Sequence, residues 1–222
     1  MCGRFTLHHD TSQIALRFDV QRTSVDVPER YNIAPTQPVA VVTVNSSRTL
    51  QMMRWGLIPS WAKDPAIGNK LINARAETLP ERPAYKSALM RRRCLIPSDG
   101  FYEWQAVGKG KQPMYIHRKD DGLFAFAGLW EEWHSPEGET VRSCTIITTA
   151  PNDLMAPIHD RMPAILRPED EAAWLDMSLK EADMALQLLR PYPAAELEAY
   201  PVSRLVNAPT NDVSDCIAPA SW

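Results

Sequence analysis

The sequence predicts an α+β protein that is rich in β-strands and forms a single domain over residues 1–222. Its nineteen prolines are nearly twice the average usage and separate short apolar runs, which favours short strands and irregular connections over long helices. With 222 residues, of which 45% are hydrophobic, the chain can bury a core without disulfide or metal staples. We find no repeat, low-complexity tract or linker that would divide it.

The N-terminal half is expected to combine a helix, a hairpin and aromatic loops. Residues 10–18 carry a capping aspartate and helical spacing. After the turn-like YNIAPTQP, the apolar segments 39–44 and 49–55 flank the polar NSSR and predict a hairpin. The aromatic loop WGLIPSWA follows, and helical spacing returns over residues 83–90.

The C-terminal half is expected to supply most of the sheet and two final helices. Apolar and β-branched runs predict strands at 93–97, 101–104, 114–118, 123–130 and 144–149. A proline followed by acidic residues starts a helix over 168–177. Ser178 and Glu181 form the capping box of another over 179–190.

Charge and hydropathy limit the classes of function. The net charge is −3 and the isoelectric point is near 6.0, so nucleic acid would have to bind to a local basic patch. No apolar run reaches the length of a membrane span, and the N-terminus lacks the apolar region of a signal peptide. We therefore expect a cytoplasmic, nucleoid-associated protein, or a nuclear one in a eukaryote, that is neither secreted nor membrane-bound.

The cysteines argue against metal or disulfide sites. Cys2, Cys94, Cys144 and Cys216 lack the paired spacing of zinc ligands, and a reducing compartment keeps them as thiols. We expect no metal and no cofactor.

Cys2 lies outside any core-forming pattern. Once Met1 is removed, its thiol and α-amine share one carbon. An α-amine with a reference pKa of about 7.7 to 8 is partly unprotonated at neutral pH, and the two nucleophiles together can capture an aldehyde as an imine and then as a thiazolidine. The alternative interpretation is an inert, disordered terminus.

Three further stretches carry polar residues that a strand or loop does not require. In LINARAET, residues Asn73, Arg75 and Glu77 alternate and would share one face of an extended segment. That face could be a solvated edge, or it could orient a reacting oxygen beside an arginine for phosphate.

In SDGFYEW, Glu103 falls on the same strand face as Phe101. Aromatic surroundings would raise the pKa of this carboxyl towards the range useful for acid/base catalysis, although a structural pair with arginine is an alternative.

His159 lies in the proline-bounded loop PIHDRMP after a predicted buried strand, where function is often placed. The other histidines, His8, His9, His117 and His134, occupy helix-start, strand or turn positions that need no catalytic role. The basic run 91–93 is interpreted as a solvated strand entry or edge.

Considered as a set, the motifs resemble one family across nearly the whole chain. They occur in the order MCGRF (1–5), YNIAPTQ (31–37), WGLIPSWA (55–62), NARAET (73–78), RCLIPSDGFYEW (93–104), HDRMP (159–163) and VNAPTND (206–212). This series resembles the SRAP (SOS-response-associated peptidase) family, whose members process abasic sites in DNA.

The resemblance implies a barrel-like fold of curved, mainly antiparallel sheets surrounded by short helices. It implies a monomer that binds single-stranded DNA containing abasic sites and crosslinks itself to the lesion through Cys2, with associated lyase and crosslink-reversal activity. Matched motif by motif, the implied catalytic residues are Cys2, Asn73, Glu103 and His159. The implied DNA-binding residues are Arg4, Arg75, Arg161, Thr148, Trp55 and Pro35.

Two other functions stay open at this point. Cys2 could attack a carbonyl with its own amine as base, as in N-terminal-nucleophile hydrolases, and the family name reflects such a peptidase proposal. The chain could also be a DNA-binding module in which Cys2 has no chemical role.

Overall fold

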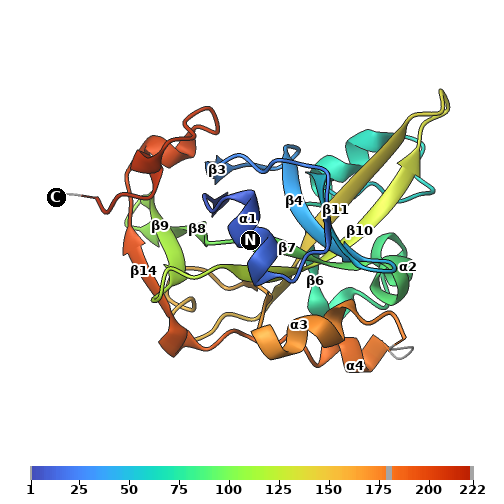
Figure 1. Cartoon of the computed structure of the whole chain (residues 1–222). Helices are drawn as coiled ribbons and strands as arrows, with labels where there is room; N and C mark the ends of the chain where they lie inside the picture. Colours follow the sequence, from blue (N-terminus) through green and yellow to red (C-terminus); the bar gives the residue numbers. More distant parts are fainter. Residues whose placement is uncertain (1, 179–181, 221–222) are drawn as a thin grey trace.

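The computed structural model describes residues 2–178 and 182–220, and antiparallel strands dominate it (Figure 1). The nine-stranded sheet contains the consecutive neighbours β11 (Thr140–Thr149), β10 (Phe124–His134), β7 (Arg93–Ser98), β4 (Pro38–Val44) and β5 (Arg48–Trp55). A further parallel pairing of β11 with β5 joins the two ends of this series. These strands therefore close into a barrel, as the family resemblance implied.

A second sheet of five strands adjoins the barrel. Its order is β14 (Leu197–Pro201), β9 (Gly110–Arg118), β8 (Gly100–Val107), β1 (Phe5–Leu7) and β3 (Arg30–Ile33). Strand β8 begins two residues after β7 ends, so the chain passes directly from the barrel into the second sheet at Asp99.

Short elements complete the described part of the chain. The minor strands are β2 (Arg22–Thr23), β6 (Asn73–Arg75), β12 (Met162–Pro163) and β13 (Ile165–Leu166). The α-helices are α1 (Thr11–Arg17), α2 (Pro83–Arg91), α3 (Pro168–Leu175) and α4 (Ala182–Leu186). The 3-10 helices are η1 (Pro65–Lys70), η2 (Ala76–Thr78), η3 (Ala194–Glu196), η4 (Arg204–Asn207) and η5 (Ser214–Cys216). None of the helices in this part of the chain is long and apolar enough to cross a membrane.

The strongest local patterns are confirmed. Strands β4 and β5 pair antiparallel as the expected hairpin, with Val41 opposite Gln51. Asp10 caps α1 by accepting from the backbone N–H of Gln13, whose side chain accepts from Asp10 in return. Helix α4 ends at Leu186 instead of the expected residue 190, and the predicted capping residue Glu181 lies outside the described residues.

Two expectations about extended backbone are wrong. The segment starting at Tyr31 was expected to be a turn, but it begins inside strand β3, and the turn follows it with Thr36 at φ 72°. Asn73 and Arg75 lie on β6, whereas Glu77 belongs to the 3-10 turn η2 and does not continue that strand face.

Burial also overturns two expectations. Cys2 is 0% exposed and belongs to the main hydrophobic cluster, so it is neither outside the core nor part of a disordered terminus. Arg93 is also 0% exposed. It is therefore not part of a solvated edge, because its guanidinium donates to the carbonyls of Leu89 (2.7 Å) and Trp174 (2.6 Å) and to that of Asp176.

Candidate functional site

The β1–β8 pairing brings Glu103 next to Cys2. In this antiparallel pair Phe5 lies opposite Phe101, and the N–H of Tyr102 donates to the carbonyl of Arg4 at 3.0 Å. Continuing the register by one residue sets Glu103 beside the chain segment that begins with Cys2. Glu103 is 3% exposed, so its side chain is shielded from bulk water.

Asn73 fixes the backbone of Cys2 from the barrel side. Its Nδ2 donates to the carbonyl oxygen of Cys2 at 2.7 Å. The position of Asn73 is itself set by β6, which pairs in parallel with β11 opposite Ile146, and by the hydroxyl of Tyr85, which donates to its carbonyl at 3.2 Å. Among the described residues, the buried Oδ1 of Asn73 has no hydrogen-bond partner, which leaves an acceptor within the site.

The surroundings of the Cys2 thiol favour its neutral form. Burial raises the pKa of this thiol, and the neighbouring charge of Glu103 raises it further. The Sγ atom lies 3.8 Å from the carbonyl oxygen of Arg4, which suits an S–H donor. Cys2 therefore differs from the cysteines of thiol hydrolases, whose pKa is lowered by a nearby cation.

The loop that carries His159 is tied to strand β8. Gln105, two residues beyond Glu103, donates from its side chain to the carbonyl of Pro157 at 3.0 Å. The Nδ1 atom of His159 lies 3.0 Å from the backbone nitrogen of Arg161 and 2.9 Å from Oδ1 of Asp160. Both contacts use the same ring nitrogen, so the loop backbone fixes the orientation of the imidazole.

Arg161 is engaged by a carboxylate in this structure. Its guanidinium binds Glu77 in a bidentate pair at 2.6 and 3.0 Å and donates to the carbonyl of Thr148 at 2.7 Å. The hydrogen bonds from Arg161 lower the pKa of Glu77. A phosphate at Arg161 would have to compete with Glu77 for the same donors.

Arg4 and Arg75 have different environments. The guanidinium of Arg4 donates to Oδ1 of Asn32 at 2.8 Å and to the carbonyl of Val206 at 2.6 Å, so it holds η4 against β3. Arg75 is exposed and borders a groove with a volume of about 410 Å³. The groove is lined by Trp61, Leu71, Asn73, Arg75, Thr78, Arg82, Pro83, Ala84 and Tyr85.

The selection of Trp55 as a base-stacking residue is wrong. Its ring is 0% exposed, packs edge-on against Phe5 with centroids 5.2 Å apart, and donates from Nε1 to the carbonyl of Ile72 at 2.9 Å. The exposed tryptophan of the same loop is Trp61, which is 59% exposed and borders the groove. The polar and charged residues that follow Trp61 in SWAKD could have indicated from the sequence that Trp61 is the exposed tryptophan of the two.

Pro35 is partly exposed and follows β3. The structure therefore places Asn73 and Glu103 next to Cys2. It also attaches the loop of His159 to β8 through the hydrogen bond from Gln105 to Pro157. The predicted roles of these residues and of the DNA-binding residues stay predictions.

The family model described as SOS response associated peptidase (SRAP) matches residues 1–209. The chain belongs to the SRAP family. It is 48% identical over 224 residues to the abasic site processing protein YoqW of Bacillus subtilis, covering 98% of this chain and 99% of that protein. It is 39% identical over 198 residues to the abasic site processing protein HMCES of Xenopus tropicalis, covering 78% of this chain and 58% of that protein.

A solved structure supports the SRAP architecture directly. The crystal structure of a protein from Bacteroides thetaiotaomicron superposes with a TM-score of 0.91 at 31% identity, covering 99% of this chain and all of that one. A second structure of the same fold, from Bordetella bronchiseptica, superposes on this chain with a TM-score of 0.79 at 26% identity and covers 91% of it.

Proposed function

We propose that this chain processes abasic sites in single-stranded DNA by forming a covalent thiazolidine through Cys2 after Met1 is removed. The observation that carries the proposal is the 2.7 Å hydrogen bond from Asn73 to the carbonyl of Cys2. That bond holds the backbone of a buried residue that combines amine and thiol, and Glu103 is its acidic neighbour. The family relatives named for abasic site processing support the choice of lesion.

The reaction starts from the ring-opened aldehyde of the abasic deoxyribose. The α-amine of Cys2 attacks C1′, and Glu103 transfers protons during addition and loss of water, so an imine and one water molecule form. The sulfur of Cys2 then adds to the imine carbon while the imine nitrogen takes up the thiol proton. Because the second step is intramolecular, ring closure is fast and the crosslink persists.

Asn73 and His159 have supporting roles in this sequence. The acceptor Oδ1 of Asn73 can bind the hydroxyl that leaves as water, and the imidazole of His159 can assist its departure. An imine also acidifies the hydrogen on C2′, so any complex that stalls before ring closure undergoes β-elimination. This elimination accounts for a weak lyase activity. The crosslinking steps in reverse, with Glu103 as the proton donor, account for slow release of the crosslink.

The neutral state of the thiol favours this order of steps over thiol hydrolysis. A hydrolase needs a thiolate as the first nucleophile, whereas burial and the charge of Glu103 raise the pKa of the Cys2 thiol. In the crosslinking sequence the amine attacks first and the thiol reacts only with an activated imine. The word peptidase in the family description keeps hydrolysis as the second candidate.

The groove beside Asn73 fits a single strand better than a duplex. Arg75 and Arg82 can contact phosphates along it, and the exposed ring of Trp61 can stack on an unpaired base. An overall net charge of −3 leaves no broad basic surface for a duplex backbone. We propose that the unpaired strand enters along this groove and presents its abasic sugar to Cys2.

Intact-mass analysis of the protein mixed with abasic single-stranded DNA tests the proposal. We expect a stable adduct that is lost in Cys2→Ser, which should form only an imine that borohydride traps. A version that retains Met1 should bind the DNA without forming the stable adduct. No adduct with the wild type, or a stable adduct with Cys2→Ser, would contradict the thiazolidine step, and peptide cleavage that needs Cys2 would favour the hydrolase.

A further inference from the structure

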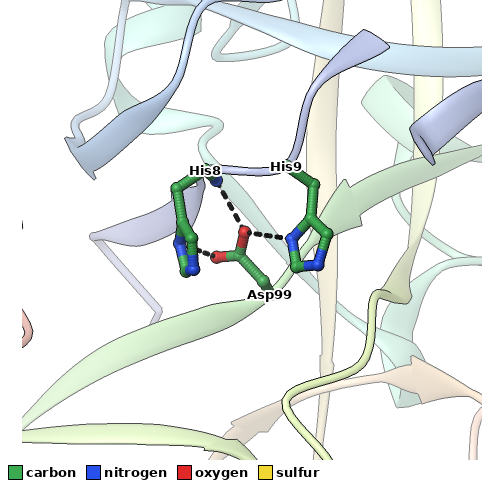
Figure 2. A group of neighbouring side chains, drawn as sticks. All are labelled: His8, His9 and Asp99. Atoms are coloured by element: carbon green, nitrogen blue, oxygen red, sulfur yellow. Dashed lines mark hydrogen bonds and ion pairs between the residues drawn. The ribbon is translucent and has the colours of Figure 1, made fainter. Parts of the chain in front are cut away.

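A second polar cluster lies at the far end of β1 from Cys2. His8 and His9 follow this strand directly, and Asp99 lies at the junction between β7 and β8. Figure 2 shows the carboxylate of Asp99 between the two imidazole rings. One ligand atom from each of the three residues lies within 4.8 Å of the other two. Nothing in the proposed DNA chemistry uses this cluster.

We propose that His8, His9 and Asp99 bind a divalent transition-metal ion of the zinc class. Two imidazole nitrogens and one carboxylate oxygen are a common protein ligand set for Zn²⁺, with water as the fourth ligand. Ligand atoms around a tetrahedral zinc ion are separated by about 3.3 Å, given bond lengths of about 2.0–2.1 Å. The Nδ1 atom of His8 lies 3.1 Å from Oδ1 of Asp99 and the Nδ1 atom of His9 lies 3.0 Å from Oδ2, so each histidine nitrogen is close to this separation from a carboxylate oxygen.

The direction of the contacts supports a cation. The Nδ1 atom of His8 is buried, yet among the described residues it has no aligned hydrogen bond, although Oδ1 of Asp99 lies 3.1 Å away. The buried Nδ1 of His8 and Oδ1 of Asp99 thus face each other at a distance that a shared cation, either a proton or a metal ion, can bridge. A metal ion coordinated by both would satisfy them.

Asp99 has the surroundings that metal-binding carboxylates require. Its Oδ1 accepts from the hydroxyl of Thr6 at 2.5 Å, and its Oδ2 accepts from the backbone N–H of His8 at 2.6 Å. Apart from the two imidazole rings, each oxygen therefore has one protein donor that orients it, and the lone pairs that now face the imidazole nitrogens can bind an ion. Asp99 is 2% exposed, so the site lies on a rigid part of the fold.

The rings of the two histidines are held in place while the site stays accessible. His8 stacks on Tyr31 with centroids 5.1 Å apart and an interplanar angle of 11°. The side chains of His8 and His9 are 29% and 21% exposed, so an ion can reach them from solvent. The negative charges of Glu29 and Asp121 also act on His8 and favour a cation there.

The bound ion would cross-link the end of β1 to the start of β8. Strand β1 begins just after Cys2 and β8 carries Glu103, so the ion would stabilise the pair of strands that positions both groups. The inference is independent of the abasic-site chemistry, because the ligands are separated from Cys2 by the length of β1.

Equilibrium dialysis of the full chain against Zn²⁺, after treatment with a chelator and under reducing conditions, tests the site. We expect one ion per wild-type chain and at least about 100-fold weaker binding in His8→Ala and His9→Ala. The matched control is His134→Ala, since His134 is an exposed histidine on β10, and it should bind as the wild type does. Circular dichroism of the zinc-free variants checks that they fold.

Spectroscopy with Co²⁺ separates this site from binding at a cysteine. The proposal requires a visible spectrum without a thiolate charge-transfer band, and it requires the spectrum to be lost in Asp99→Asn. It is overturned if folded wild-type protein takes up no ion. It is also overturned if uptake is unchanged in both histidine variants, or if a thiolate band appears that Cys2→Ser removes.

Discussion

At the scale of single residues, the candidate site depends on a cysteine whose reactivity is restrained by its surroundings. Cys2 is buried, its carbonyl is held by Asn73 at 2.7 Å, and Glu103 is its acidic neighbour. In the proposed function, this arrangement holds the residue for addition to an aldehyde, while burial favours the uncharged thiol. It differs from an exposed thiolate, which would oxidise or react without selectivity.

The restrained thiol gives a prediction about alkylation. Because burial and the charge of Glu103 both raise the pKa of Cys2, the thiolate fraction is small at neutral pH and grows as the pH rises. The rate of modification by iodoacetamide, followed at Cys2 by peptide mass mapping, should therefore still be rising between about pH 7 and about pH 9. Glu103→Gln removes a negative charge that disfavours the thiolate, so it should raise this rate at fixed pH.

Glu132→Gln is the matched control for alkylation, since Glu132 lies on the β10–β11 hairpin and should leave the rate at Cys2 unchanged. A rate that has already reached a plateau by about pH 7 would mean that the thiolate predominates. That result would support the hydrolase.

Glu77 gives a second prediction at this scale. Its carboxylate occupies the guanidinium of Arg161 in a bidentate pair, so it competes with DNA phosphate. Glu77→Gln should therefore strengthen binding to single-stranded DNA by about two- to fivefold, in line with the small free energy of exposed ion pairs. Fluorescence anisotropy with an unmodified oligonucleotide measures the change, and the double variant with Arg161→Gln should abolish the gain. Weaker binding of Glu77→Gln would mean that the pair orients Arg161 for DNA.

A sequence motif fixes where a residue lies along the chain, but it does not show which side chains are buried. Asn73 and Glu103 do come together with Cys2, because their motifs lie on strands whose pairing brings them to one place. The motif WGLIPSWA does not show that the ring of Trp55 faces inward while that of Trp61 is exposed. The cluster of His8, His9 and Asp99 could not be predicted from the sequence, because Asp99 lies 90 residues from His9 along the chain.

At the scale of elements, Arg93 joins two helices to the barrel. This buried arginine on β7 donates to carbonyls at the end of α2 and at the end of α3, so it satisfies groups that would otherwise be buried without partners. Helix α3 packs against β7 and β10. The same contacts explain why a basic run of three residues contains one member that never meets solvent.

Replacing this arginine should be costly. We expect Arg93→Met to lower the free energy of unfolding by roughly 3–5 kcal/mol, because the carbonyls lose a charged donor inside the core. Arg91→Met, at an exposed position in the last turn of α2, should change it by no more than about 0.5 kcal/mol. Urea unfolding followed by circular dichroism measures both. Equal losses in the two variants would contradict a special role for Arg93.

Element prediction worked for long periodic segments and failed for short pairings. The hairpin of β4 with β5 and the capped helix α1 follow from local patterns. Strands of two or three residues, such as β6, form only because a neighbouring strand offers them hydrogen bonds. The parallel pairing of β5 with β11 closes the barrel across many residues of chain, and no local pattern encodes it.

At the scale of the whole molecule, an acidic protein must bind a polyanion. The net charge of −3 opposes DNA at long range, so affinity has to come from a few arginines and from stacking in the groove. Asn73 lies on β6 of the larger sheet and lines the groove, while Glu103 lies on β8 of the second sheet and Cys2 precedes β1 of that sheet. The proposed function therefore places DNA contacts and covalent chemistry at the junction of the two sheets.

This balance predicts a shallow salt dependence. If the three predicted arginines Arg4, Arg75 and Arg161 each neutralise one phosphate of a single strand, the slope of log K against log salt concentration should be about −2, since each contributes about −0.7. Titrations of single-stranded DNA over a range of salt concentrations measure this slope. Arg75→Gln should make it shallower by about 0.7, whereas Arg142→Gln on the β10–β11 hairpin should leave it unchanged. A slope of about −5 or steeper would mean that a broader basic surface binds the strand than these arginines provide.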